Sequence, residues 1–255
     1  QGAFTFISMN QRICLQSWAP LRSIAHSKGE MVSSLLFGET CTVLSSDGEW
    51  LHVRVDHDGY LGWIPDLYLS ELRGVVVDGW QMVREVGAFF LGEDGDVIAL
   101  SPGSRIPGER VSIEGRVYYY RSGKFLVAGA AAAAKAFLNT PYLWGGRSIW
   151  GIDCSGLVQA VGKVMDVAMP RDAYQQAMVG KSCLWEQRRP GMLAYFSNAD
   201  GKVVHVGILL DDDLIIHAYG KVRIDKLTAQ GIVNATSGAL THKLCDLRFW
   251  PEELS

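Results

Sequence analysis

The chain has 255 residues, of which 48% are hydrophobic and 20% charged, and its formal net charge is −3. This composition excludes disordered, collagen-like and long coiled-coil chains, and a near-balanced charge without a basic stripe argues against nucleic acid as a partner. No apolar run approaches the roughly 20 residues needed to cross a bilayer. We therefore expect a globular protein without a membrane span, long enough for two or three small domains.

The cysteines show no pattern of a metal site or of a disulfide framework. Their number is odd and no C-x-x-C pair occurs among Cys14, Cys41, Cys154, Cys183 and Cys245. No H-E-x-x-H or similar set of metal ligands is present. We therefore expect no metal and no other cofactor, and at least one free thiol unless cysteines pair between chains.

Residues 30–70 have the texture of short strands joined by tight turns. Asp-Gly pairs at 47–48 and 58–59 predict two of these turns. Between the pairs, in Trp50–Val55, Leu51, Val53 and Val55 share one face of the predicted strand. Trp50, His52 and Arg54 share the other face. Short strands at this spacing predict a small β-barrel, and we place this first domain at residues 1–71.

Residues 72–128 repeat this texture less clearly. Gly-Asp, Pro-Gly and Ser-Gly pairs separate short apolar runs. The predicted strands are Val75–Val77, Ala88–Leu91, Val97–Leu100, Val111–Ile113 and Val117–Tyr120. We predict a second, divergent copy of the first β-domain over these residues.

From residue 129 onward the sequence predicts helices and then strands. The alanine-rich run around Ala130–Ala134 forms helix readily and Thr140-Pro141 ends it. A second helix fits Cys154–Met165, where apolar residues recur at helical spacing. The predicted strands are Met192–Phe196, Val203–Leu210 and Leu214–Tyr219. This order predicts an α+β domain over residues 129–255.

Cys154 has the surroundings of a nucleophile. The stretch 142–156 reads YLWGGRSIWGIDCSG, so a glycine-rich loop meets a helix start at this cysteine, with Asp153 as the predicted N-cap. The positive end of the helix dipole and free backbone N–H groups favour the thiolate there, and the same N–H groups could stabilise an oxyanion. The alternative is a buried cysteine without a chemical role.

Two histidines on neighbouring predicted strands supply a candidate base. His205 opens the strand HVGILL, His217 lies in IIHAY, and three aspartates at 211–213 separate the strands. With a three-residue loop, the two histidines become diagonal neighbours on one face, about 7–8 Å apart; a two-residue loop would put them on opposite faces. The pattern predicts a nucleophile, a base and a second imidazole that orients the base. Two strand histidines bonded to backbone groups are the alternative.

The order of these motifs resembles the NlpC-type cell-wall peptidases, which are papain-like cysteine enzymes. Asp153-Cys154-Ser155-Gly156 at a helix start is followed by His205-Val206-Gly207 and then by His217. Further matching segments are Thr140-Pro141-Tyr142, Trp144-Gly145-Gly146, Pro170-Arg171-Asp172, Gln175-Gln176 and Pro190-Gly191-Met192-Leu193. The resemblance covers about residues 129–220 and implies a papain-like domain with helices packed on an antiparallel sheet.

The first part of the chain resembles bacterial SH3-like domains. The matching residues are Gly38-Glu39, Val43-Leu44, Trp50, Val53 and Gly62-Trp63-Ile64. Two such domains before a catalytic domain resemble the γ-D-glutamyl-L-diamino acid endopeptidases, which cut murein stem peptides. The resemblance implies SH3-like β-barrels at 1–71 and 72–128, and a cysteine peptidase domain at 129–255.

The resemblance also implies roles for single residues. Cys154 would attack the γ-D-glutamyl carbonyl, His205 would be the base and His217 would orient it. Tyr142 and the Cys154 N–H would face the oxyanion. The residues implied to line or adjoin the substrate subsite are Asp153, Ser155, Arg171 and Asp172.

Two further substrate residues are implied in the first SH3-like domain. In those endopeptidases this domain caps the cleft and helps to hold the free amine of the terminal L-Ala. Glu30 and Tyr60 match the acidic and tyrosine positions best, although both could be solvated turn residues. The expected partner is therefore a murein stem peptide, L-Ala-γ-D-Glu-diamino acid, with a free N-terminus.

The chain departs from the family pattern at two positions. Met192 stands where many members have Asp, which we expect to affect local structure. Ala173 follows Arg171-Asp172 where related sequences often have Ser, and this removes a possible hydrogen bond to substrate.

Two other functions stay open at this point. A muramoyl-L-alanine amidase would use the same cysteine and histidine, but it must leave room for the sugar, whereas the cap residues favour the peptidase. A non-catalytic cell-wall-binding protein would not need Cys154, His205 and His217 together. The sequence does not distinguish diaminopimelate from lysine at the third position of the peptide. The first residue is Gln1 rather than Met, which favours a leader that was removed, so we expect a protein of the bacterial cell envelope, periplasmic or secreted, with the cytoplasm as the alternative. We also expect a monomer.

Overall fold

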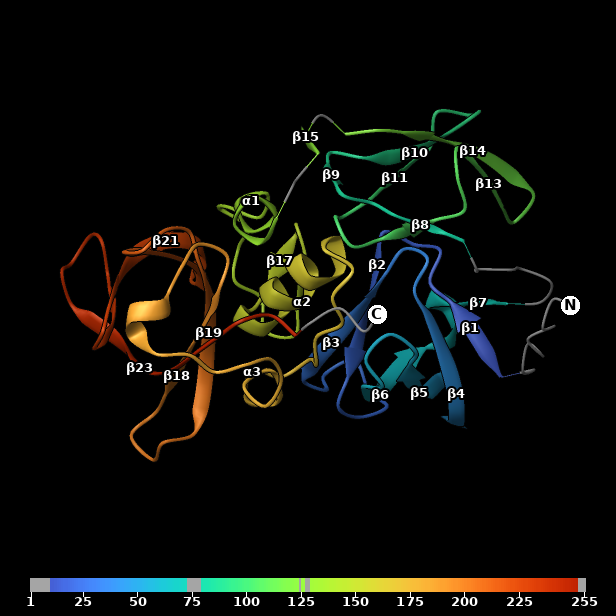
Figure 1. Cartoon of the computed structure of the whole chain (residues 1–255). Coiled ribbons are helices and arrows are strands. Elements are labelled where there is room, and N and C mark those ends of the chain that lie inside the picture. Colours follow the sequence, from blue (N-terminus) through green and yellow to red (C-terminus); the bar gives the residue numbers. More distant parts are fainter. Residues whose placement is uncertain (1–9, 73–78, 124, 127–128, 252–255) are drawn as a thin grey trace, which may run out of the picture. The chain divides into compact units, whose positions relative to one another are not determined.

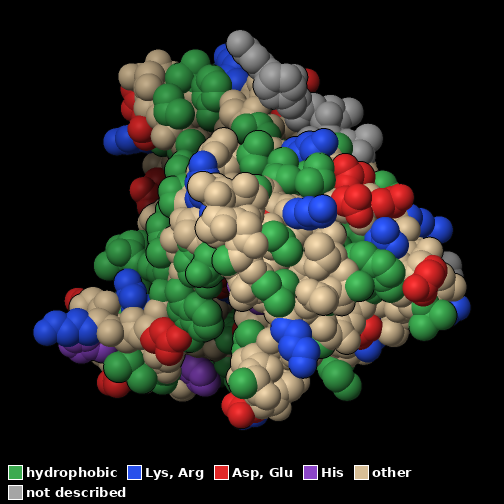
Figure 2. Space-filling model, turned by 90° about the vertical axis from the view of Figure 1, so that its left-hand side faces the viewer, with side chains coloured by type: hydrophobic (Ala, Val, Ile, Leu, Met, Phe, Trp, Pro, Cys, Tyr) green, Lys and Arg blue, Asp and Glu red, His purple; other side chains and the backbone are tan. Residues whose placement is uncertain are grey.

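A computed structural model describes residues 10–72, 79–123, 125–126 and 129–251. The chain divides into two compact units, Gln1–Phe125 and Leu126–Ser255 (Figure 1). Strands predominate in both units. Among the described residues, no helix has the length and apolar character to span a membrane. On the face shown in Figure 2, Lys and Arg side chains are interspersed with Asp, Glu and hydrophobic ones.

The first unit begins with one antiparallel sheet of seven strands, hydrogen-bonded in the order β3-β2-β6-β5-β4-β1-β7. The strands are β1 (Gln11–Ile13), β2 (Trp18–Arg22), β3 (Met31–Leu36), β4 (Thr40–Asp47), β5 (Trp50–Val55), β6 (Leu61–Pro65) and β7 (Ser70–Glu71), with a 3-10 turn at Asp66–Tyr68. The predicted alternation in β5 is confirmed, because Leu51, Val53 and Val55 are buried in one core. Both predicted Asp-Gly turns are present, with positive φ at Gly48 and Gly59.

The rest of the first unit is a smaller β-region. Its strands are β8 (Gln81–Met82), β9 (Glu85–Val86), β10 (Phe89–Gly92), β11 (Val97–Ala99), β12 (Arg105–Ile106), β13 (Arg110–Ile113) and β14 (Arg116–Arg121), followed by β15 (Phe125–Leu126). Four of them form a sheet in the order β11-β10-β14-β13. The predicted strands are found except Val75–Val77, which lies outside the described residues. That this region is a second SH3-like domain, and the boundaries at 71 and 128, stay predictions.

Over residues 129–251, the second unit has three short helices and six strands beside two small bridging strands. The helices are α1 (Ala130–Lys135), α2 (Cys154–Val164) and α3 (Ala173–Gln176), with a 3-10 turn at Trp185–Gln187, and the bridging strands are β16 (Arg147–Ser148) and β17 (Gly151–Ile152). Helix α2 begins at the predicted residue and is buried along its whole length. It packs against α1 and β19 in a core of small and β-branched side chains.

The six strands pair antiparallel throughout and close into a barrel, whereas the resemblance predicted helices packed on an antiparallel sheet without specifying that the sheet closes. They are β18 (Leu193–Ser197), β19 (Val203–Leu209), β20 (Leu214–Tyr219), β21 (Lys221–Thr228), β22 (Gly231–Val233) and β23 (Leu240–Arg248). Pairing of β18 with β23 closes the ring. The last three strands were not predicted. The α+β class is correct in containing both elements, but the unit is mostly β.

Alternate residues of the barrel strands enter two different cores. Leu193, Tyr195 and Val206 face the helices, while Phe196, Leu209 and Ile215 belong to a second cluster with Leu227, Ile232 and Leu247. Both faces of these strands are therefore buried, which explains why β18 and β19 are nearly continuous apolar runs. Side chains alternate along a strand, so His205 lies on the same face of β19 as Leu209, and His217 lies on the same face of β20 as Ile215.

Candidate active site

The Asp153 carboxylate caps the helix that carries Cys154. One of its oxygens, Oδ1, accepts the backbone N–H of Gly156 at 2.7 Å, as an N-cap does. The other, Oδ2, accepts the N–H of Gly145 from the preceding loop at 2.8 Å. The predicted cap is therefore confirmed, and the same carboxylate ties the glycine-rich loop to the start of α2.

Arg171 completes a buried polar cluster around that cap. Its guanidinium contacts Oδ2 of Asp153 at 2.5 Å and Oδ1 at 3.1 Å, and it donates to the Ser155 hydroxyl at 2.8 Å. The side chains of Arg171 and Asp153 are only 2% and 6% exposed. Because the two charges neutralise each other out of water, this cluster holds the helix start in place. Its predicted contact with substrate stays a prediction.

Gly156 allows the loop and the helix to approach each other closely. A Cβ at this position would lie 2.1 Å from the carbonyl oxygen of Gly146. No side chain fits at that separation, so the first turn of α2 requires glycine there. The close approach brings the loop 143–146 against the helix start that presents Cys154.

The Cys154 thiol is buried, and this reverses one expectation. Burial, followed by the negative charge of Asp153, raises the thiol pKa to about 12, whereas backbone hydrogen bonds from Val206 and Ser155 and the charge of Arg171 lower it. The Ser155 N–H at the helix start therefore lowers the thiol pKa, as predicted, but burial and the charge of Asp153 outweigh it. An isolated thiolate is disfavoured at neutral pH, so Cys154 needs a base to take its proton.

The predicted register of the histidine strands is confirmed. Gly207 pairs with His217 across β19 and β20, and the Leu210 N–H donates to Leu214 O at 2.8 Å, so the loop at 211–213 has three residues. The two rings meet edge to face, with Nε2 of His205 2.8 Å from Nδ1 of His217. Glycine at 207 leaves the position opposite His217 without a side chain, where a Cβ would lie 3.0 Å from the His217 Cβ.

Asp225 continues this row of side chains and was missed from the sequence. Its Oδ2 lies 3.0 Å from Nε2 of His217, and both side chains are buried. In the register of β20 and β21, His217 pairs with Arg223, which makes Asp225 its diagonal neighbour. The rule that related His205 to His217 would have found Asp225, if the turn at Gly220 and the strand after it had been predicted.

Burial keeps both histidines neutral. It is the largest cause that lowers the pKa of His205 well below its ordinary value, with the charges of His217 and His242 acting in the same direction. Burial also lowers the pKa of His217 to about 4, although the hydrogen bond and charge of Asp225 act against this. Together with the raised pKa of the thiol, these values describe a resting pair of neutral thiol and neutral imidazole.

His242 is the second residue that the sequence analysis missed. Its ring, on β23, stacks on His205 at 4.2 Å between centroids and with 26° between planes. Ring nitrogens of His205, His217 and His242 all lie within 4.8 Å of one another, a spacing that could hold a metal ion. An ion there would have to replace the proton shared by His205 and His217. That the reaction needs no metal stays a prediction.

Tyr142 lies where it can act on charge at Cys154. Burial, then the charges of Cys154 and Asp153, raises the pKa of its phenol, so the hydroxyl stays protonated and can donate a hydrogen bond. Its backbone N–H donates to Gly220 O at 3.0 Å, which ties this loop to the turn between β20 and β21. Tyr142 and Cys154 are thus close enough for their charges to interact, and their role at an oxyanion stays a prediction.

The remaining predicted substrate residues occupy turns and caps. Asp172 is the N-cap of α3 and forms a capping box with Gln175, and Ala173 is the first residue of that helix. In the first unit, exposed Glu30 precedes β3 and half-buried Tyr60 precedes β6. Both strands pair with Arg22 at the end of β2, so the two residues lie at the same end of their sheet. Their contact with substrate stays a prediction.

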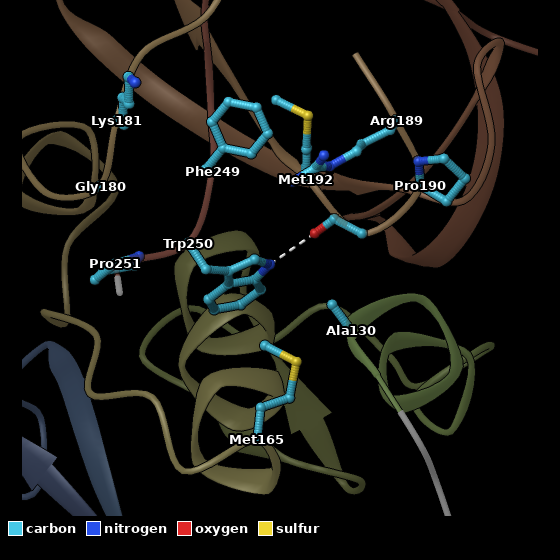
Figure 3. A pocket seen from close by; sticks show the side chains of 11 residues that line it. Ala130, Met165, Gly180, Lys181, Arg189, Pro190, Met192, Phe249, Trp250 and Pro251 are labelled. Atoms are coloured by element: carbon cyan, nitrogen blue, oxygen red, sulfur yellow. Dashed lines mark hydrogen bonds between the residues drawn. The ribbon is translucent and has the colours of Figure 1, made fainter. Parts of the chain in front are cut away.

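A cavity of about 860 Å³ opens at the other end of α2 (Figure 3). Met165, just after the helix, lines it together with Trp250, whose indole N–H donates to Gly191 O at 2.6 Å. Met192, one of the two departures from the family pattern, also lines it and is buried. Because the 11-residue helix is about 16 Å long, this cavity is separate from Cys154 at its first turn.

Comparison with known sequences identifies both parts of the chain. Residues 139–241 match the NlpC/P60 family, and residues 21–67 match the bacterial dipeptidyl-peptidase Sh3 domain. A γ-D-glutamyl-L-lysine dipeptidyl-peptidase of Bacillus subtilis is 28% identical over 211 residues, which cover 73% of this chain and 71% of the relative. An enzyme of the same name from Bacillus cereus is 27% identical over 248 residues, covering 82% of this chain and 74% of the relative.

A solved structure has the same fold over nearly the whole chain. The crystal structure of an NlpC/P60 family protein from Bacillus cereus superposes with a TM-score of 0.79 at 20% identity, covering 95% of this chain and all of the other. An NlpC/P60 endopeptidase from Photobacterium damselae gives a TM-score of 0.66 at 17% identity, covering 94% of this chain and 71% of that one. Residues 139–241 therefore belong to the NlpC/P60 family of cysteine peptidases, and they follow an N-terminal bacterial Sh3 domain.

Proposed function

We propose that this protein is a cysteine peptidase that hydrolyses the bond between γ-D-glutamate and the diamino acid of murein stem peptides. The observation that carries the proposal is the packing of α2, which begins at Cys154 behind the Asp153 cap, against β19, the strand of His205, whose ring is hydrogen-bonded to His217. The names of the two Bacillus relatives support the choice of bond. A binding protein would not need this set of groups.

The first half-reaction would start from the neutral pair. His205 takes the proton of the Cys154 thiol as the sulfur attacks the γ-carbonyl, so that a C–S bond forms and the carbonyl oxygen becomes an oxyanion. The Tyr142 hydroxyl and the Cys154 N–H would donate to that oxyanion. The imidazolium then gives its proton to the leaving amine of the diamino acid, and a thioester remains on Cys154.

The second half-reaction would use the same histidine. Neutral His205 takes a proton from water, the water oxygen attacks the thioester, and the thiol leaves with the proton from His205. His217 keeps the ring of His205 in one orientation through both halves. We therefore expect His205→Ala to be about as damaging as loss of Cys154, and His217→Ala to be less damaging. If His217→Ala proved worse, the two roles would have to be exchanged.

We further propose that the substrate must carry a free N-terminal L-Ala, so that the product is the dipeptide L-Ala-γ-D-Glu. Support comes from the Sh3-domain match, which contains both Glu30 and Tyr60, and from the word dipeptidyl-peptidase in the names of the relatives. A carboxylate that pairs with the substrate ammonium discriminates strongly, because without the ammonium it would be left desolvated and unpaired. Peptides still joined to muramic acid lack the N-terminal ammonium, and their sugar would not fit beside the terminal residue.

The test compares four substrates by product mass. Free L-Ala-γ-D-Glu-diaminopimelate and L-Ala-γ-D-Glu-L-Lys should release the dipeptide, while the N-acetylated peptide and muramoyl peptide should be cut slowly or not at all. Equal rates for free and acetylated peptides would refute the amine requirement but leave the peptidase intact. Release of the sugar from a muramoyl peptide would identify an amidase. Glu30→Gln should lose activity on the free peptide, with Glu71→Gln in the same unit as the control.

A further inference from the structure

We propose that Asp225 is a positioning residue of this site, which determines through His217 which nitrogen of His205 carries the proton. The inference rests on the proposed function, in which His205 accepts the proton of the Cys154 thiol. Asp225 lies in β21, outside every motif that the sequence analysis singled out, and its side chain is 1% exposed. Three side chains on neighbouring strands, Asp225, His217 and His205, form one continuous row of hydrogen bonds.

The protons in this row can be counted. An ionised carboxylate has no hydrogen to give, so Nε2 of His217 must be the donor to Asp225. A neutral imidazole carries a single N–H, and Nδ1 of His217 is therefore a lone pair that accepts from Nε2 of His205. That leaves Nδ1 of His205 without a proton. It is the one ring nitrogen of His205 outside the row, and hence the one that can receive the proton of the thiol.

The charge states on which this count depends follow from the surroundings. Burial acts to raise the pKa of Asp225, but the N–H of Ala235, His217 and Arg223 together hold it below its ordinary value. Both histidines are kept neutral by burial. A neutral histidine pair beside an ionised aspartate is therefore the state at neutral pH.

Asp225 is held so that only one of its oxygens faces the histidine. Its Oδ1 accepts from the Ala235 N–H at 2.8 Å and from Nη2 of Arg223 at 2.9 Å, and Nε of Arg223 lies 2.7 Å from Oδ2. The carboxylate is anchored by its own strand and by the turn after β22. This fixed orientation is what a group that sets a tautomer requires.

Asp225 and Arg223 together carry little net charge. Asp225 therefore acts by positioning protons and not by its electric field at His205. Arg223 neutralises Asp225, and a full imidazole ring stands between the pair and His205. Its field at the reacting nitrogen is therefore weak compared with that of a lone carboxylate. What the row transmits is the position of the protons.

Asp225→Asn should reverse every proton in the row. Ala235 N–H and Nη2 of Arg223 both donate to Oδ1, whereas Nε of Arg223, although 2.7 Å from Oδ2, makes no hydrogen bond to it. The amide oxygen will therefore take the Oδ1 position, and the NH2 group will face His217. The NH2 then donates to Nε2 of His217, His217 donates from Nδ1 to Nε2 of His205, and His205 carries its proton on Nδ1. The base is blocked, and we expect turnover to fall by about 10²–10⁴-fold.

Nitrogen-15 NMR of the histidine rings reads this directly and needs no substrate. In the wild type at pH 7.5 we expect His205 and His217 both to be protonated on Nε2. In Asp225→Asn both should be protonated on Nδ1. Asp246→Asn is the matched control, because Asp246 is a partly buried aspartate of the same barrel that pairs with Arg248, and it should leave the histidine pattern unchanged.

A second variant separates positioning from stability. Asp225→Ala leaves Arg223 and the Ala235 N–H unpaired, so it should lower the melting temperature more than Asp225→Asn does. It offers His217 no donor, however, and should retain more turnover than Asp225→Asn. A purely structural role predicts the opposite order of turnover, following stability, and that order would overturn the proposal.

Alkylation of Cys154 by iodoacetamide, mapped by peptide mass, measures whether His205 can still take the proton of the thiol. The wild type should react through its imidazole-assisted thiol at pH 6–8, and Asp225→Asn should lose that reactivity. A folded Asp225→Asn protein with unchanged ring protonation, or with wild-type alkylation, would refute the inference. If the tautomers reverse but no murein peptide is cut by the wild type, the row of hydrogen bonds is correct and the proposed substrate is wrong.

Discussion

Two buried aspartates of the second unit, Asp153 and Asp225, are each paired with an arginine, yet their surroundings give them different tasks. Around Asp153 every recorded partner is a donor that does not titrate near neutral pH: two backbone N–H groups, a hydroxyl and Arg171. Asp225 has a backbone N–H and Arg223 as well, but its remaining oxygen faces an imidazole. One carboxylate fixes where a chain segment lies, and the other fixes where a proton lies.

Removal of the thiol that both aspartates serve should have the largest effect on activity. Cys154→Ala should remove essentially all turnover while the melting temperature stays close to that of the wild type, because a buried thiol and a methyl group differ little in volume. Peptide cleavage followed by mass spectrometry checks this. Retention of more than about 1% of wild-type turnover would contradict the role of Cys154 as the nucleophile. Cys14→Ala, in the core of the first unit, is the control and should act through stability alone.

Loss of Asp153 should affect folding more than any change at Asp225. Asp153→Ala leaves the buried guanidinium of Arg171 unpaired and removes the cap of α2, and we expect a loss of about 3–5 kcal/mol in the free energy of unfolding. Urea unfolding measures it. Asp225→Asn, which keeps its partners at Oδ1, should lose less stability and far more turnover per folded molecule. Equal losses of stability in the two variants would contradict the division of tasks.

The pH dependence of stability should reflect His217, the histidine that is hydrogen-bonded to Asp225. The folded-state pKa of His217 is lowered to about 4, and that of an unfolded histidine is near 6.5. Between these two pKa values the histidine is protonated in the unfolded chain but neutral in the folded one. The free energy of unfolding therefore rises with pH in this window and reaches its full value above it. We expect a slope near 1.4 kcal/mol per pH unit for one proton, steeper where His205 also contributes.

Urea unfolding at pH 4.5 to 8 measures this slope, and His217→Asn should reduce it. Asp225 adds to this slope only below its ordinary pKa of about 3.9. Because its folded-state pKa lies lower still, its stabilisation is fully present above the ordinary value and is lost as the pH falls through the folded-state pKa. A flat profile between pH 4.5 and 6.5 would show that the buried histidines do not titrate as described.

The smallest expected effect belongs to His242. Its charge is one of the causes that lower the pKa of His205, so His242→Phe, which keeps the stacked ring, should raise that pKa and move the acid limb of the activity profile upward by less than one pH unit. Turnover at pH 8 should change by no more than about threefold. A large loss at pH 8 would assign His242 a direct part in the reaction.

Much of this site could be predicted from local sequence rules. The helix start at Cys154 follows from glycines and a cap residue that act within a few positions of each other, and the register of the two histidines follows from the length of the loop at 211–213. Asp225 and His242 could not be placed in the same way. They lie on β21 and β23, whose sequences KVRIDKLT and LTHKLCDLR mix charged and apolar residues without a clean period.

Closure of the barrel explains why these strands escaped prediction. A charged residue normally marks an exposed position, but Asp225 is buried because Arg223, Ala235 and His217 satisfy it. Such pairing depends on contacts between strands far apart in the chain, which sequence periodicity does not record. The thiol pKa is a second example, since burial by the whole unit outweighed the local effect of the helix start.

The most direct test of the central claim is an affinity label built on the proposed product. A chloromethyl ketone derived from L-Ala-γ-D-Glu, with the ketone in place of the scissile carbonyl, should lose chloride and attach one equivalent to Cys154, as shown by peptide mass. Labelling should be blocked by excess L-Ala-γ-D-Glu and be slow in His205→Ala and Asp225→Asn. Attachment to another cysteine, or labelling of Cys154 at the same rate in those variants, would contradict the account.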